Sequence, residues 1–202
     1  MSDLVLSLVT GFGAYVIFAS AFLSCLALPI PTSLMMLSGG AFVATGDLSL
    51  WTVVLAAYAG AVLGDQTGYM LARWGGAPLL AHLARAPARR AALDRARALV
   101  ERRGAVGVFF STWLLAPLGP WVNFVAGATG FSWARFALWD ILGEVIWVTT
   151  YVGLGYAFSS SIGTVADVMG NIVGLLVAVT VAIAMGLWIR TILRQQRRAR
   201  AP

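Results

Sequence analysis

Two prolines one residue apart, Pro29 and Pro31, interrupt an apolar run that extends over residues 22–43. Each proline removes a backbone N–H donor and shifts the residue before it away from helical geometry. Water can compensate for the lost hydrogen bonds, but hydrocarbon cannot, and each unpaired backbone group in lipid costs several kcal/mol. A broken backbone at membrane depth therefore has to be buried in protein or line a water-filled cavity.

A second interruption, which contains Pro117 and Pro120, breaks a later apolar run in the same way. Paired broken segments in the two halves of a chain indicate the binding site of a membrane transporter. We therefore expect Pro29 and Pro31 to form the tip of one hairpin, and Pro117 and Pro120 to form the tip of another.

The composition requires an integral membrane protein. Of the 202 residues, 60% are hydrophobic and 11% are charged, whereas about 25% are charged in a soluble domain. All fourteen basic residues are arginines, gathered mainly between Arg73 and Arg103 and between Arg190 and Arg200. Such clusters mark cytoplasmic segments, close to anionic lipid head groups. Nucleic-acid binding is not expected, because no soluble domain is present to display the arginines.

The chain has one cysteine, Cys25, which excludes an internal disulfide and any site built from several cysteines. We expect no metal and no cofactor. The N-terminal apolar run over residues 4–23 is interpreted as a retained span. An acidic Asp3 precedes it in place of a basic region, and no small-residue cleavage site follows it.

The sequence predicts an all-α membrane protein with about four transmembrane helices in a single domain. Apolar segments long enough to cross about 30 Å of hydrocarbon occur at 4–23, 51–72, 133–158 and 165–189. The broken segments, whose arms are too short to span, are expected to form re-entrant hairpins at 25–45 and 106–129. The arginine-rich regions are interpreted as a cytoplasmic loop with an interfacial helix, residues 73–105, and a cytoplasmic tail, residues 190–202.

These segments have a consistent topology when both arginine clusters lie in the cytoplasm. Both termini are then cytoplasmic, and two hairpin-plus-helix units, 25–72 and 107–158, point in opposite directions. This arrangement is an inverted repeat, as in many transporters. In the alternative, both broken segments cross the membrane as kinked helices, and the sequence leaves that alternative open.

Three carboxylates fall inside the predicted spans, where ionisable groups indicate function by default. Asp65 lies on the second span and either serves transport or binds hairpin backbone groups that the prolines leave free. Asp140 and Glu144 lie one turn apart on one helix face, a spacing that suits a proton acceptor. For Glu144, pairing with Arg135 or with hairpin backbone is the structural alternative.

Neutral polar side chains near both breaks offer donors to a substrate. They are Thr32 in the first hairpin, and Thr112 and Asn123 in the second. Helix N-termini at the hairpin tips present free N–H groups that attract anions such as phosphate. Local capping of the helices is the competing interpretation.

Several short motifs are spread over about residues 20–160. They are Pro29-Ile30-Pro31-Thr32 with Gly39-Gly40, Gly64-Asp65-Gln66-Thr67-Gly68-Tyr69, Arg73-Trp74-Gly75-Gly76, Phe109-Phe110-Ser111-Thr112-Trp113-Leu114, Gly119-Pro120-Trp121-Val122-Asn123, Ala126-Gly127, Gly143, Trp147 and Gly153-Leu154-Gly155-Tyr156. In this order and spacing the chain resembles the DedA family, also called VTT-domain or SNARE-associated membrane proteins. The resemblance implies two opposed re-entrant hairpins in a bacterial-type inner membrane. It also implies the movement or flipping of lipids, polyprenyl phosphate carriers included, driven in some members by the proton gradient.

The chain departs from the family pattern at charged positions. The family commonly has an acidic residue near the position of Ser24, an arginine at the position of Thr112, and another near Gly119-Pro120. All three charges are missing here. Our hypothesis is that Glu144 replaces the acid missing at Ser24 and approaches the same cavity from the other repeat.

The predicted function is therefore a transporter or scramblase of lipids or lipid-linked phosphate carriers, with proton coupling left open. A membrane scaffold without transport activity is one alternative. A membrane-embedded enzyme is the other, and we expect none, because one histidine and one cysteine supply neither a triad nor a metal set. The remaining acid pair, Asp140 and Glu144, lies on one helix without a facing partner. A homo-oligomer remains open.

Overall fold

The computed structural model describes residues 2–115 and 117–161. The predicted span 165–189 and the basic tail 190–202 lie outside the described residues. Within the described part of the chain every regular element is helical, which confirms the predicted all-α class. The helices are α1 (Ser2–Ser24), α2 (Thr32–Ala44), α3 (Leu50–Leu83), α4 (Pro87–Trp113), α5 (Gly119–Ala128) and α6 (Trp133–Ala157), followed by a 3-10 turn at Ser159–Ser161.

Both predicted proline breaks separate helices. The first break, Cys25 to Pro31, includes Ala27 in the left-handed region at φ 61°. It is held to α1 at its far end, where the Thr32 hydroxyl donates to the Ser20 carbonyl at 2.8 Å. The second break lies between α4 and α5, and Gly119 and Pro120 begin α5.

The first hairpin differs from the prediction in its arms. Residues 25–45 contain a single helix, α2, and α1 supplies the other arm. The prediction treated residues 4–23 as a separate span, because that apolar run is long enough to cross a membrane by itself. Local sequence does not show that α1 packs back against the segment that follows it.

Helices α3 and α4 each extend further than predicted, and each bends at a glycine. Helix α3 continues past Ala72 to Leu83 and bends at Gly76, where φ is 53°. Helix α4 begins with Pro87 in its first turn and bends at Gly104, where φ is 54°. Positive φ is a conformation that glycine adopts without strain. Most of the predicted loop 73–105 is therefore helical.

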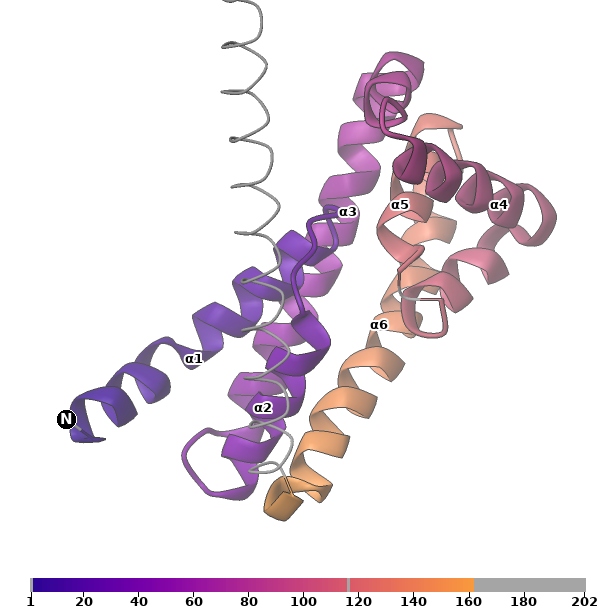
Figure 1. Ribbon diagram of the computed structural model, residues 1–202. Helices are drawn as coiled ribbons and strands as arrows, with labels where there is room; N and C mark the ends of the chain where they lie inside the picture. The colour runs from indigo at the N-terminus through magenta and orange to yellow at the C-terminus, as the bar shows by residue number, and fades with distance from the viewer. Residues whose placement is uncertain (1, 116, 162–202) are drawn as a thin grey trace, which may run out of the picture. The chain divides into compact units, whose positions relative to one another are not determined.

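The helices of residues 1–159, which form one compact unit, pack in related pairs. Helix α1 packs on α3 and α4 packs on α6, while α2 packs on α6 and α5 packs on α3 (Figure 1). Helices α3 and α6 also contact each other. Two clusters of buried hydrophobic side chains result. One joins α1 and α2 to parts of α3 and α6, and the other joins α4 and α5 to the remaining parts.

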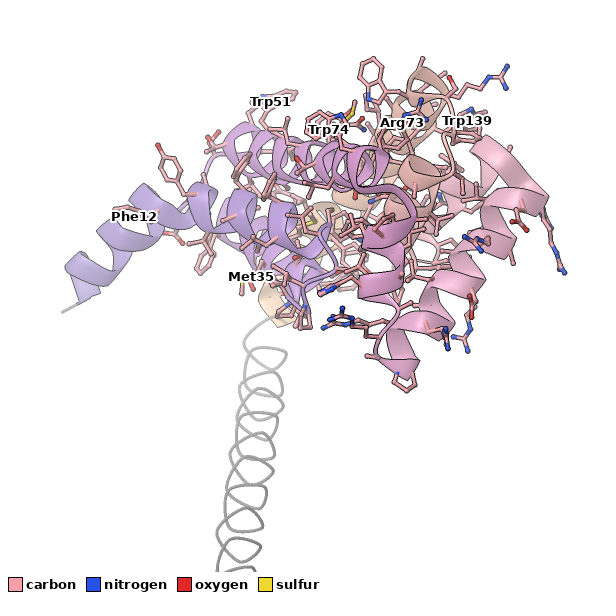
Figure 2. All side chains as sticks on the ribbon, turned by 90° about the horizontal axis from the view of Figure 1, so that it is seen from above. Phe12, Met35, Trp51, Arg73, Trp74 and Trp139 are labelled. Atoms are coloured by element: carbon pink, nitrogen blue, oxygen red, sulfur yellow. The ribbon has the colours of Figure 1, made fainter. Side chains whose placement is uncertain are left out.

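Among the described residues, only α6 is both long and apolar enough to cross a membrane by length and composition. Phe12–Ser24 and Thr32–Ala44 are apolar but shorter. Large apolar side chains face outward, among them Trp51 and Trp74, which are 72% and 81% exposed and project from the ribbon in Figure 2. Such exposure is typical of a surface that contacts lipid.

Candidate functional site

A cavity of about 330 Å³ lies where the two proline breaks meet. It is lined from both halves of the chain, by residues that follow α1 and α4 and by the first residues of α2 and α5. Nine of the ten residues predicted for the site line it: Pro29, Pro31, Thr32, Asp65, Thr112, Pro117, Pro120, Asn123 and Glu144. The structure thus brings together residues that are far apart in sequence.

The packing of α3 and α6 explains where the acidic residues lie. On α3, Ala61 belongs to one hydrophobic cluster and Tyr69 to the other, and Asp65 lies between them. On α6, Phe136 and Trp147 likewise belong to different clusters and enclose Asp140 and Glu144. The carboxyls therefore occupy the polar middle of two crossing helices, and they are 0–4% exposed.

Close packing of α3 against α1 brings Asp65 near the end of α1. The preceding residue is Gly64, and a Cβ atom there would overlap the carbonyl oxygen of Phe22 and lie 2.8 Å from the Cβ of Cys25. One turn earlier, Gly60 meets the carbonyl of Phe18 in the same way. Small residues at four-residue spacing allow two membrane helices to approach. They bring the Asp65 carboxyl to the end of α1.

Asp65 is bonded across the site to the second hairpin. The side-chain amide of Asn123, near the start of α5, donates to Asp65 Oδ1. Both side chains are buried. The sequence prediction left open a bond between Asp65 and hairpin backbone, and the structure shows a side-chain partner from the other half of the chain instead.

Asp140 is the one predicted site residue that does not line the cavity. Its Oδ2 accepts a hydrogen bond of 3.0 Å from Gln66 Nε2. Gln66 Oε1 in turn accepts one of 2.9 Å from Trp133 Nε1. Because Trp133 is 52% exposed, this chain of bonds extends from the start of α6 at the surface to a fully buried carboxyl.

Two of the three carboxyls lie close together. One carboxylate oxygen of Asp65 and one of Glu144 lie within 4.8 Å of each other, and Asp140 lies one turn before Glu144 on α6. Within the described residues, Asp140 Oδ1 and Glu144 Oε2 have no hydrogen-bond partner. Among the described residues, no arginine, lysine or histidine lines the cavity. Arg135, the partner considered for Glu144, is exposed and more than two turns away along α6.

Two threonines of the cavity wall donate their hydroxyl protons to backbone carbonyls. Thr32 donates to the Ser20 carbonyl, and Thr112 donates to the Val108 carbonyl at 3.0 Å. Their oxygen lone pairs remain as acceptors. Positive character in the cavity comes instead from the N-termini of α2 and α5, which begin at Thr32 and Gly119 and carry no side-chain cap.

Sequence reasoning missed three residues of the site. Cys25 and Trp147 line the cavity, and Gln66 connects Trp133 to Asp140. Cys25 was considered only as a partner for other cysteines. Its position four residues before Pro29 was the signal that could have placed it beside the first break.

The structure supplies a facing carboxyl for the two acids of α6. The sequence interpretation found no facing partner for the acids of α6, Asp140 and Glu144. Asp65 supplies that partner from α3, a different helix. A pair of carboxyls on facing helices is able to share a proton.

Comparisons with known proteins show which family the sequence matches. The sequence profile of the VTT domain matches residues 30–157. The chain is 40% identical over 152 residues to an uncharacterized membrane protein of Synechocystis, a match that covers 72% of this chain and 66% of that protein. It is 29% identical to Protein DedA of Escherichia coli over 84% of this chain and 75% of that protein. The inner membrane protein YabI of Escherichia coli is 27% identical over 84% and 67%. No solved structure matches the chain.

Proposed function

The chain belongs to the VTT domain family of membrane proteins, and from this premise we propose that it moves lipids or lipid-linked phosphate carriers across the bacterial inner membrane. The observation that carries the proposal is the cavity formed jointly by the two proline breaks. Irregular backbone at membrane depth is tolerated where it lines such a cavity. Broken helices from two halves of a chain characterise transporter sites.

An inverted repeat underlies this proposal, and two pairs of close contacts support it. A Cβ at Gly40 of α2 would overlap α6 backbone at Val152 and Tyr156. A Cβ at Gly127 of α5 would overlap α3 backbone at Tyr69 and Arg73. In each case the helix after a proline break, α2 or α5, carries a glycine that touches a helix of the other half at two residues four positions apart. If α1, α2 and α3 are matched with α4, α5 and α6, the packing of α1 on α3 also corresponds to the packing of α4 on α6.

Re-entrant hairpins fit the lengths of the arms. Helix α2 has 13 residues and α5 has 10, or about 20 Å and 15 Å at about 1.5 Å per residue. A hydrocarbon core is about 30 Å thick. Neither arm reaches across, so each hairpin would enter and leave on one side.

Proton coupling follows from the charge of the cavity. Asp65 and Glu144 line it without a basic neighbour among the lining residues, and unpaired buried charges are expensive in low dielectric. Bound protons relieve that charge, so uptake and release of a proton would accompany loading of the cavity. The N-termini of α2 and α5 would bind the anionic part of a lipid head group. The exposed arginines of α4 would contact anionic lipids at the membrane surface.

Lipid flux in proteoliposomes tests the proposal. We expect the purified chain to move a fluorescent phospholipid or a polyprenyl phosphate between leaflets, faster with a pH gradient than without. Glu144→Gln should lower this flux at least tenfold and remove its response to the gradient. Glu101→Gln is the matched control, because Glu101 is exposed on α4 and undergoes the same chemical change. Absence of flux under both conditions would contradict the proposal.

The same vesicles separate transport from catalysis. The facing carboxyls of Asp65 and Glu144 are the specific feature that favours a membrane-embedded hydrolase as a second candidate. Mass analysis of the lipids after incubation distinguishes the two, because transport returns the lipid unchanged. Cleaved head groups that disappear in Asp65→Asn and persist in Asp94→Asn would favour the hydrolase.

A further inference from the structure

Three potential ligand side chains from three parts of the chain converge on the cavity. Cys25 follows α1, Asp65 lies on α3 and Glu144 lies on α6. One Sγ and two carboxylate oxygens, one from each residue, all lie within 4.8 Å of one another. All three side chains are buried and line the cavity.

We propose that Cys25, Asp65 and Glu144 form a binding site for a divalent transition-metal ion of the zinc type. A thiolate with two carboxylates belongs to the donor sets that zinc accepts. A sulfur ligand disfavours magnesium and calcium, which prefer oxygen ligands. The inference goes beyond lipid movement and makes no use of it.

An unpartnered polar atom supports the site independently of the clustering. Glu144 lines the cavity and is only 2% exposed, and its buried Oε2 has no hydrogen-bond partner among the described residues. A buried carboxylate oxygen without a donor loses its hydration without compensation. A cation in the cavity would supply the missing interaction.

The geometry allows coordination after small side-chain rotations. Zinc–sulfur bonds are about 2.3 Å and zinc–oxygen bonds about 2.0–2.2 Å, so neighbouring ligand atoms on a tetrahedral ion are about 3.3–3.8 Å apart. The present separations reach up to 4.8 Å. Three protein ligands leave a fourth position toward the cavity for water, as in sites where zinc remains accessible.

A supporting contact already orients one ligand. The amide of Asn123 holds Asp65 Oδ1, which leaves Oδ2 for the ion. Outer hydrogen bonds of this kind fix the direction of metal ligands. On binding, the thiol proton of Cys25 and any carboxyl protons pass to water in the cavity, because the ligands have to be deprotonated.

Cobalt(II) titration of the full chain in detergent tests the site. Cobalt replaces zinc in such sites and gives a sulfur-to-cobalt charge-transfer band only where a thiolate binds the ion. We expect a band that saturates at one equivalent and that zinc abolishes by displacement. Because Cys25 is the only cysteine, Cys25→Ser should eliminate the band and weaken binding at least tenfold.

Two further variants keep the test decisive. Glu144→Gln should weaken cobalt binding at least tenfold while the charge-transfer band persists at high cobalt, and Glu101→Gln should behave as the unmodified chain. Zinc should raise the thermal midpoint of the unmodified chain and of Glu101→Gln, and leave that of Cys25→Ser unchanged. Absence of a band, or equal midpoint shifts in all variants, would overturn the metal site. Neither readout involves lipid flux, so the site and the proposed transport fail separately.

Discussion

At the scale of single residues, the three carboxyls in and beside the cavity differ in their hydrogen-bond partners. Asp65 is bonded to Asn123, and Asp140 to Gln66. Glu144 has one oxygen without a donor in the described part of the chain. Side-chain donors therefore hold Asp65 and Asp140 in place. Within the described residues, Asp140 and Glu144 each keep one oxygen without a partner, and of these two acids only Glu144 lines the cavity.

The bond between Asp65 and Asn123 is expected to be worth a measurable free energy. In a double-mutant cycle with Asp65→Ala and Asn123→Ala, we predict a coupling of about 0.6–1.7 kcal/mol, between the average and the largest value measured for side-chain hydrogen bonds between membrane helices. Reversible unfolding of the four proteins in mixed micelles gives the value. A coupling indistinguishable from zero would show that the two side chains do not interact.

Sequence reasoning reached much of the site but not its connections. The prolines predicted the two breaks between helices, and Thr32, Thr112 and Asn123, which were predicted near those breaks, line the cavity with them. Burial of Asp65, Asp140 and Glu144 followed from their position within apolar spans. The link from Trp133 through Gln66 to Asp140 joins residues about 70 positions apart, and no local pattern specifies such a contact. The roles of these residues stay predictions.

At the scale of helices, glycines determine how closely the halves approach. Gly40 and Gly127 each lie directly against the backbone of a helix from the other half. Close approach at these two points holds the second hairpin arms, α2 and α5, against α6 and α3. The α1 arm was not predicted as part of a hairpin, because its apolar length resembled a complete span and its packing partner lies elsewhere in the chain.

Glycine-to-alanine substitutions should separate packing from helix propensity. Gly40→Ala and Gly127→Ala are expected to destabilise the protein by about 1–3 kcal/mol each, as overpacking does, because the added methyl group meets backbone. Gly153→Ala is the control, since a Cβ there has no neighbour within 4 Å. It should stabilise α6 slightly through its higher helix propensity. Thermal unfolding in one detergent measures all three, and a similar loss at Gly153 would contradict the packing argument.

At the scale of the whole molecule, the open question is on which side each hairpin begins and ends. The described helices α2 and α5 are too short to cross, and we expect the arginines of α4 on the cytoplasmic side. Re-entrant hairpins place Ser132 on the same side as Arg102. Kinked spans would place them on opposite sides, because the segment between them would cross once.

Cysteine labelling in a Cys25→Ser background decides between these topologies. Ser49→Cys, Arg102→Cys and Ser132→Cys introduce thiols at exposed positions. An impermeant maleimide applied to intact spheroplasts should label Ser49→Cys, while the other two should react only after lysis. Labelling of Ser132→Cys in intact spheroplasts would show that residues 106–129 cross the membrane.

The matched glycine contacts have a consequence for direction. The pairing that matches Gly40 with Gly127 and Tyr69 with Val152 also matches Asp65 with Val148, and Asn123 with Met36. Both counterparts are buried and apolar, so Asp65 and Asn123 have no polar counterpart at the matched positions of the other half. A form open to one side and a form open to the other would then differ in energy between identical solutions. Such a molecule would prefer one opening before any gradient acts on it, and turning it over in the membrane would move that opening to the other side.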